Sequence, residues 1–144
     1  MNCWFKNGVE SEIYYYPGVN YQIRQVMALT YTSKSGSLGC NFGSQLALFS
    51  KSGRLVKRTG KVEPPRMDRG AKFKLKVKDG YFESYLNKRK KMKAKYSERK
   101  FQSGRVGLIW GGGMASFVSR MEITGHIDYA YMFKVLQKIP EPEE

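Results

Sequence analysis

The chain has 144 residues, of which 41% are hydrophobic and 14% aromatic. It contains 26 Lys and Arg residues and 12 Asp and Glu residues, which gives a formal net charge of +14. This length is typical of one domain and is sufficient to bury a core without a metal ion or a disulfide. The composition excludes collagen, a coiled coil and a wholly disordered chain, and its many Gly, Tyr and Phe residues favour β-structure with frequent turns.

The N-terminal end lacks a recognisable targeting segment. The first eight residues contain no basic stretch followed by an apolar run, and nowhere does the chain reach 18 consecutive apolar residues. We therefore expect no signal peptide and no transmembrane segment, so that the chain as given is cytoplasmic, or extracellular if a leader was removed.

Short segments of alternating apolar and polar residues are separated by turn residues. In chain order, strands are predicted over 21–32, 38–42, 46–50, 55–56, 71–78, 81–86, 105–110 and 117–124. Turns are predicted at 33–37, 51–54 and 111–113, a loop at 59–70, and a two-residue hairpin at Asp79-Gly80. The helical spacing of apolar residues between 132 and 139 indicates either a short C-terminal helix or a last strand. The pattern predicts an all-β antiparallel sandwich or barrel, one domain over 1–139 with a polar tail at 140–144.

Cysteine and histidine are scarce. Cys3 and Cys40 either pair in an oxidising compartment or remain two buried thiols. His126 is the only histidine and there is no Cys-x-x-Cys motif, so no zinc site is expected. The acidic residues are scattered in a strongly basic chain, so no calcium site and no cofactor are expected.

The positive charge is concentrated in one third of the chain, because residues 54–100 hold 18 of the 26 basic residues and 5 of the 12 acidic ones. Within it, four lysines alternate with Phe73, Leu75 and Val77, so that a strand would carry all four on one face. We name these four the lysine comb: Lys72, Lys74, Lys76 and Lys78. The comb is either a solvated strand face or a row of cations, about 6.6–6.8 Å apart, that faces an anionic polymer.

A second basic segment follows over residues 88–95. It contains Lys88, Arg89, Lys90, Lys91, Lys93 and Lys95. This run is predicted to be either a mobile, solvated hairpin loop or, together with the comb, an anion-attracting surface. Tyr81 and Tyr85 share one face of their strand, and we expect this to be the face of the comb. Trp110 and Tyr31 are weaker candidates for aromatic contacts with a ligand.

Three stretches of the C-terminal half form a recognisable pattern: Phe73 to Asn87, Gly104 to Leu108, and Phe117 to Gly125. It resembles the closing strands of concanavalin A-like lectin and glucanase domains, a group that includes laminin-G-like modules and the 3-keto-disaccharide hydrolase family. The resemblance implies two curved antiparallel sheets in a jelly roll, often with a carbohydrate site on the concave face or at the loop rim. The chain departs from the pattern of these domains in two ways. Lys88 replaces the Gly expected after Asn87, so a long basic loop is expected there. The chain is also short for this fold, as a trimmed domain or fragment would be.

Catalytic constellations are not evident. Glu10 and Glu12 are the nearest match to the paired carboxylates of glycosidases, with Tyr14 where a third acid would stand, and we expect them on a solvated strand. Asp79 is explained by its hairpin and Glu83 by pairing with comb lysines. A lone His126 is expected to be structural, so the chain is predicted not to be an enzyme, with glycoside hydrolysis as the minor alternative.

These observations favour a non-catalytic, lectin-like module that binds an acidic polysaccharide or other polyanion. Its expected contacts are the comb, Tyr81 and Tyr85, and the basic residues of 88–95. Sequence-nonspecific nucleic-acid binding is the alternative, because Lys and Tyr interleave as on surfaces that follow a phosphate backbone. A third hypothesis is an interaction domain of a larger assembly that docks an acidic protein or an anionic membrane surface.

Overall fold

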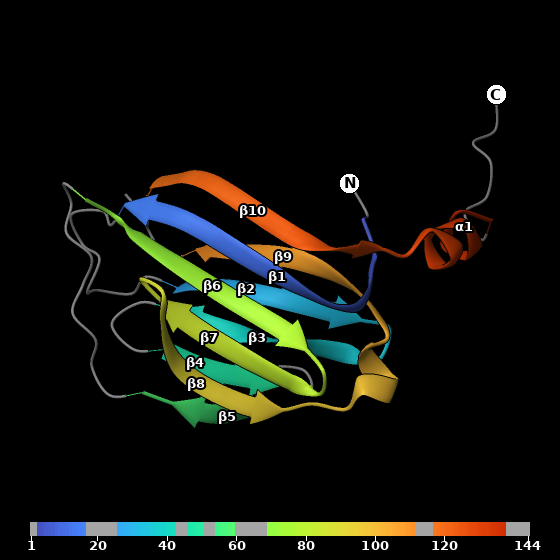
Figure 1. The fold of residues 1–144 in the computed structure, drawn as a ribbon, viewed down its shortest axis with the longest axis horizontal. Coiled ribbons are helices and arrows are strands. Elements are labelled where there is room, and N and C mark those ends of the chain that lie inside the picture. The colour runs from blue at the N-terminus through green and yellow to red at the C-terminus, as the bar shows by residue number, and fades with distance from the viewer. Residues whose placement is uncertain are drawn as a thin grey trace.

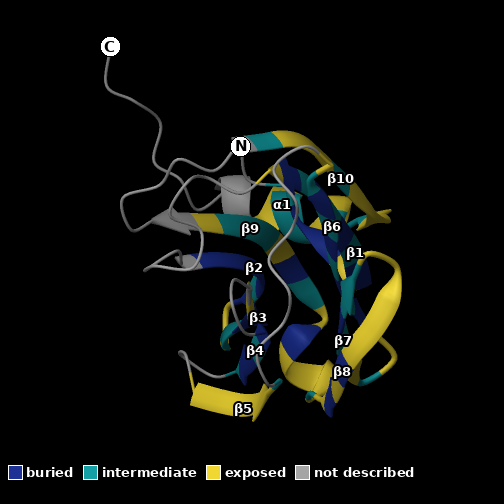
Figure 2. Cartoon of the chain, turned by 90° about the vertical axis from the view of Figure 1, so that its left-hand side faces the viewer, coloured by how far each residue is buried: buried dark blue, intermediate teal, exposed yellow. Residues whose placement is uncertain are grey.

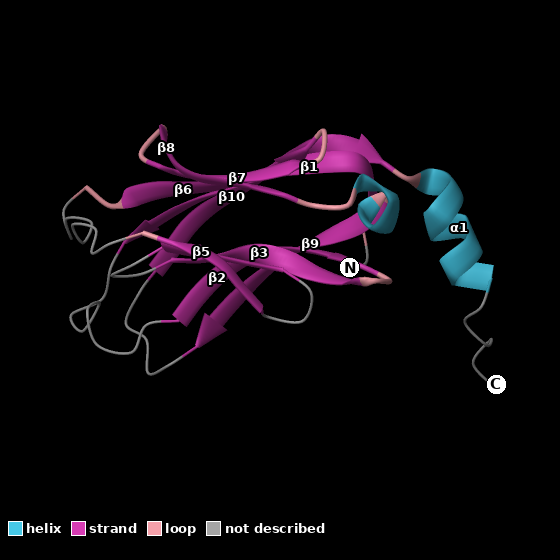
Figure 3. Cartoon of the chain, turned by 90° about the horizontal axis from the view of Figure 1, so that it is seen from below, coloured by secondary structure: helices cyan, strands magenta, loops and turns pink. Residues whose placement is uncertain are grey.

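The computed structural model describes residues 3–16, 26–42, 46–50, 54–59, 69–111 and 117–137. Within these ranges the chain forms antiparallel strands in two layers, with one α-helix beyond one end of them (Figures 1 and 3). The strands are β1 (Phe5–Tyr16), β2 (Val26–Ser33), β3 (Gly36–Phe42), β4 (Leu46–Ser50), β5 (Arg54–Arg58), β6 (Ala71–Lys78), β7 (Tyr81–Leu86), β8 (Arg89–Lys95), β9 (Ser103–Gly111) and β10 (Phe117–Ile127). The predicted all-β sandwich is thereby confirmed.

Among the described residues, each layer is a sheet of five strands. Sheet A has the order β10-β1-β6-β7-β8, and sheet B has the order β9-β2-β3-β4-β5. Strand β9 joins the layers, because Gly104 pairs with Phe5 of sheet A whereas Arg105 pairs with Thr32 of sheet B. Figure 3 shows the two sheets as separate layers seen from their edge.

The core lies between the sheets and is formed by residues of both. Figure 2 shows buried residues on strands of both sheets, whereas β5 is exposed throughout. Strands β1 and β6 show the alternation most regularly, with burial switching at every residue over most of their length. The largest fully buried side chains are Tyr15, Tyr31, Phe73, Phe82, Ile13, Met27, Leu29, Leu38, Leu46, Leu48 and Leu75. In β1 and β6, period-2 patterning therefore determines which face contributes to the core.

The C-terminal segment is the helix α1 (Tyr129–Gln137), one of the two structures that its apolar spacing allowed. Asp128 caps the helix, because its carboxylate accepts the backbone N–H of Tyr131 at 2.9 Å. The Ser103 hydroxyl also donates to this carboxylate, and these bonds hold the pKa of Asp128 below its usual value. The ring of Trp4 packs on Tyr131 with 4.6 Å between centroids, which fixes α1 at the end of the sandwich.

Two tight turns connect the last three strands of sheet A. Asp79 and Gly80 have φ of 54° and 82°, and Asn87 and Lys88 have φ of 50° and 70°. Positive φ at both central residues is the requirement of a type I′ hairpin turn, so Asp79-Gly80 is a hairpin as predicted. The expectation of a long basic loop after Asn87 is wrong: Lys88 occupies the position usually held by Gly, the turn stays two residues long, and 89–95 is the strand β8.

Several predictions fall on residues outside the described ranges: the strand start at 21–25, most of the loop at 59–70, the turn after Gly111 and the tail at 140–144. Both cysteines are free thiols; burial raises the pKa of Cys40 to about 12, while Cys3 is half-buried. Over the part of the chain that is described, no helix has the length and apolarity to cross a membrane. The same residues include no group of His, Cys, Asp and Glu side chains suited to a metal ion.

Candidate functional site

The outer face of sheet A carries the lysine comb. In β6 the residues Ala71, Phe73, Leu75 and Val77 are buried against sheet B, so the four comb lysines point away from the core. Lys72, Lys74 and Lys76 are half-buried and Lys78 is exposed. The strict alternation that is visible in the sequence is therefore realised in the sheet.

Strand register brings the predicted tyrosines and part of the second basic segment to the same face. Tyr85, Glu83 and Tyr81 of β7 lie opposite Lys74, Lys76 and Lys78 of the comb. On the far side of β7, Lys90, Lys93 and Lys95 of β8 lie opposite the same three residues. Residues from three consecutive strands thus form one continuous polar surface.

Three of the predicted basic residues lie outside these cross-strand pairs. Arg89 is opposite Leu86, which packs against the core, so the Arg89 side chain alternates away from the comb. Lys91 is the extra residue of a bulge between the pairs Ser84–Met92 and Tyr85–Lys90. Lys88 lies in the turn at one end of the sheet.

Acidic side chains partly neutralise the outer face. Lys76 Nζ lies 3.7 Å from Glu10 Oε1, and Glu83 pairs with Lys90 at 3.5 Å and with Lys93 at 3.9 Å. Glu12 and Glu122 are opposite each other on β1 and β10 and add two further carboxylates. The comb, the three lysines of β8 and Arg120 outnumber these four glutamates, so the face keeps an excess of positive charge.

Glu83 contacts three side chains of this face: Tyr85, Lys90 and Lys93. Burial of its carboxyl opposes ionisation, but the hydrogen bond from the Tyr85 hydroxyl and the charges of Lys90 and Lys93 outweigh burial and lower the pKa of Glu83. Burial and the bond to Glu83 raise the pKa of Tyr85 to about 12. Glu83 thus stays charged and Tyr85 protonated across the physiological range.

Cations lie over the tyrosine rings of this face. The Lys74 Nζ is 4.9 Å from the Tyr85 ring centroid, and the Lys93 Nζ is 4.1 Å from that of Tyr81. Tyr14 has Lys72 Nζ at 4.7 Å and Arg120 Cζ at 5.1 Å. The rings therefore hold the ammonium groups in place, and a ligand that stacks on a ring has to displace a cation.

Strands β1 and β10 also contribute to the outer face, and the sequence did not predict this. Glu10, Glu12, Tyr14 and Arg120 lie on the same outer face, on β1 and β10. The alternation of Glu10, Glu12 and Tyr14 could have indicated this, but the sequence does not show which strand β1 pairs with. The prediction that Tyr31 contacts a ligand is wrong, because its side chain is fully buried and its hydroxyl donates to the Phe5 carbonyl at 3.3 Å. The side chain of Trp110 lies outside the described part of the structure.

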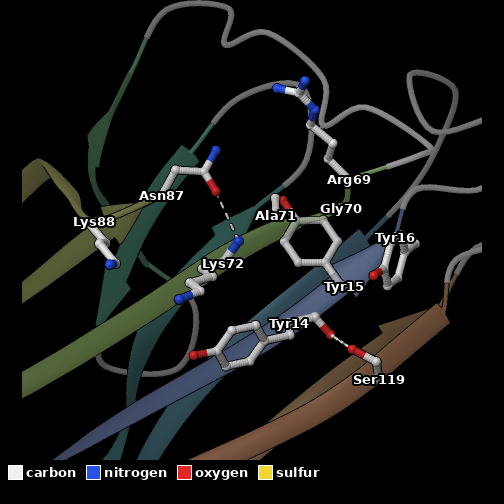
Figure 4. A pocket seen from close by; sticks show the side chains of 10 residues that line it. All are labelled: Tyr14, Tyr15, Tyr16, Arg69, Gly70, Ala71, Lys72, Asn87, Lys88 and Ser119. Atoms are coloured by element: carbon white, nitrogen blue, oxygen red, sulfur yellow. Dashed lines mark hydrogen bonds between the residues drawn. The ribbon is translucent and has the colours of Figure 1, made fainter.

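A pocket opens at the end of sheet A where β1 ends and β6 begins (Figure 4). Its volume is about 310 Å³, within the range of sites for small molecules. Lys72, the first residue of the comb, lines it together with residues of the β7–β8 turn and of β10. The pocket is therefore continuous with the outer face.

The fold is shared with a carbohydrate-binding module and with galectins. A carbohydrate-binding module, CBM66 from Bacillus subtilis, superposes with a TM-score of 0.64 at 15% identity, over 83% of this chain and 76% of that one. The Caenorhabditis elegans galectin LEC-6 gives 0.57 at 12% identity, over 83% and 84%, and chicken galectin 2 gives 0.55 at 11%, over 85% and 98%. The chain thus shares a two-sheet β-sandwich fold with these proteins, and the likeness extends to the fold alone. No protein-family model and no curated protein matches the sequence.

Proposed function

We propose that the protein is a non-catalytic module that binds an acidic polysaccharide on the outer face of sheet A. The supporting observation is the arrangement of comb lysines and β8 lysines on both sides of Tyr81, Glu83 and Tyr85. The resemblance to concanavalin A-like domains and the likeness to CBM66 and galectins favour a glycan over other anionic polymers.

Both electrostatic attraction and hydrogen bonding would contribute to binding of the polysaccharide. The lysines supply a field that draws in carboxylate- or sulfate-bearing chains, and their ammonium groups are charge-assisted donors. The glutamates and tyrosine hydroxyls offer partners for sugar hydroxyls, as mixed polar surfaces do in glycan sites. The same field would attract a nucleic acid, which makes that alternative an outcome of the test.

The test compares heparin, polygalacturonate, a neutral β-glucan and single-stranded DNA at two salt concentrations. A comb variant, Lys74→Gln with Lys76→Gln and Lys78→Gln, is compared with a control that removes the same charge from exposed residues elsewhere: Arg54→Gln, Arg58→Gln and Lys100→Gln. We expect the comb variant to lose most of its affinity for both acidic polysaccharides and the control to lose less. A slope of log affinity against log salt that is shallower by about 2 would match the three lost contacts.

Three results would contradict the proposal in different ways. Wild-type affinity in the comb variant would exclude the outer face of sheet A. Salt-independent binding of the neutral β-glucan would place a neutral-sugar site elsewhere. Binding of single-stranded DNA as tight as that of heparin would favour a general polyanion surface.

A further inference from the structure

The pocket at the end of sheet A has cationic walls. Its charged lining residues within the described part of the chain are Arg69, Lys72 and Lys88, and none of the lining residues is acidic. This contrasts with the rest of the outer face, where glutamates lie between the lysines. An anion in the pocket would meet three cations, without a competing carboxylate among the described residues of the wall.

Lys88 occupies a backbone position that a lysine adopts at a cost. Its φ of 70° lies in the left-handed region, which favours glycine, and the neighbouring β6–β7 turn does have glycine, Gly80, at the equivalent second position with φ of 82°. The two turns differ in what surrounds them, because Lys88 lines the pocket and Gly80 does not. Unfavourable backbone conformations are concentrated at binding sites, so the lysine is explained by a role for its ammonium group there.

Asn87 is anchored so that it presents a donor to the pocket. Its side-chain Oδ1 accepts the backbone N–H of Lys72 at 3.0 Å, and its own backbone N–H donates to the Lys72 carbonyl at 2.8 Å. The oxygen of the amide is thereby engaged, and the amide nitrogen remains as a donor. Figure 4 shows the Asn87 side chain directed toward Lys72, with Lys88 beside it.

The remaining wall is the tyrosine run of β1. The Tyr14 ring stands between Lys72 and Arg120, and Ser119 ties β10 to β1 by donating to the Tyr14 carbonyl at 3.2 Å. At the floor, Gly70 permits the close approach of β6, because a Cβ there would lie 2.6 Å from the Tyr15 carbonyl oxygen. These contacts join β1, β6 and β10 in the wall of the pocket.

We infer that this pocket binds a single sugar unit that carries a carboxylate or a sulfate, and that it thereby supplies the specificity of the module. The anionic group is held by Arg69, Lys72 and Lys88, with the Asn87 amide as donor to a neighbouring oxygen. The inference rests on the proposed function, since the polysaccharide extends from the pocket along the comb. Arg69 presents a planar pair of donors that matches either anion.

The experiment uses digalacturonate, which carries only carboxylates, a sulfated heparin disaccharide, and neutral cellobiose as probes, with affinity measured by calorimetry. Lys88→Gly is the main variant, Arg69→Gln the second, and Lys91→Gln removes a neighbouring charge outside the pocket as the control. We expect Lys88→Gly and Arg69→Gln each to lose about tenfold in affinity for at least one acidic disaccharide. We expect Lys91→Gln to change affinity by less than about twofold.

Lys88→Gly also has a second readout that separates a ligand role from a structural one. Because glycine relieves the left-handed conformation, its melting temperature should rise by about 2–5 °C while its affinity falls. Affinity for both acidic disaccharides equal to that of the wild type in both pocket variants would overturn the pocket assignment, and persistent binding of heparin polymer would leave the proposed function intact. Absence of binding of any acidic polymer to the wild-type chain would overturn both.

Discussion

At the scale of single residues, Glu83 connects a tyrosine and two lysines of the outer face. It accepts a hydrogen bond from Tyr85 and pairs with Lys90 and Lys93, with 13% of its side chain exposed. Because these contacts lower the pKa of Glu83, the folded state favours its charged form more than the unfolded chain does. This stabilisation is present above the unfolded pKa, about 4.3, and is lost as the pH falls through the lower folded value.

Glu83→Gln should therefore lower the free energy of unfolding by about 1 kcal/mol at pH 7. Urea denaturation of wild type and variant at pH 7 and at pH 3 measures this. The difference between the two proteins should shrink at pH 3, where the wild-type carboxyl approaches protonation. A difference that stays equal at both pH values would show that the ion pairs are not its source.

At the scale of elements, the sequence identifies the strands in which apolar and polar residues alternate without interruption. Strand β6 is predicted residue by residue because apolar side chains alternate with lysines without interruption. Strand β8 is missed because only Met92 and Ala94 mark its inner face, and a bulge at Lys91 breaks the period. The turn before it is missed because Lys88 replaces the glycine that usually signals a type I′ turn.

The crossing of β9 between the sheets depends on a close contact. Gly104 lies against Tyr31, and a Cβ at this position would be 2.5 Å from Cζ of that ring. Tyr31 is fully buried and donates to the Phe5 carbonyl, so its ring has little room to move. We expect Gly104→Ala to lower the free energy of unfolding by about 1–3 kcal/mol.

A double-mutant cycle tests this contact. In a Tyr31→Leu background, where the ring is absent, Gly104→Ala should cost much less than in the wild type, as measured by urea denaturation. An equal cost in both backgrounds would mean that Gly104 is required for another reason than the Tyr31 ring.

At the scale of the whole molecule, the fold is predictable and the pocket is not. Turns and alternation suffice for a two-sheet sandwich, since each strand needs only to bury one face. The pocket is assembled from the end of β1, the start of β6, the β7–β8 turn and β10, which are far apart in the sequence. Which strands become neighbours depends on pairing across the sheet, and no local pattern encodes it.

The net charge of +14 implies that the folded chain repels itself. Lys78 and Lys95 have no acidic partner within 4 Å among the described residues, whereas Lys90 and Lys93 pair with Glu83. Removing either pair of lysines changes the net charge equally, so repulsion alone predicts the same gain in stability for both.

Pairing predicts opposite signs at low salt. We expect Lys78→Gln with Lys95→Gln to raise the free energy of unfolding by about 0.5 kcal/mol, and Lys90→Gln with Lys93→Gln to lower it by a similar amount. Urea denaturation in about 10 mM salt, where the Debye length is about 30 Å, gives the comparison. In about 1 M salt the Debye length falls to about 3 Å. The stability gain of the Lys78 and Lys95 variant should then vanish, and the stability loss of the Lys90 and Lys93 variant should shrink. Salt screens the repulsion between distant charges more strongly than the attraction within a contact ion pair. A gain for both variants would show that the field of the whole molecule, and not the local pairs, governs the stability of this face.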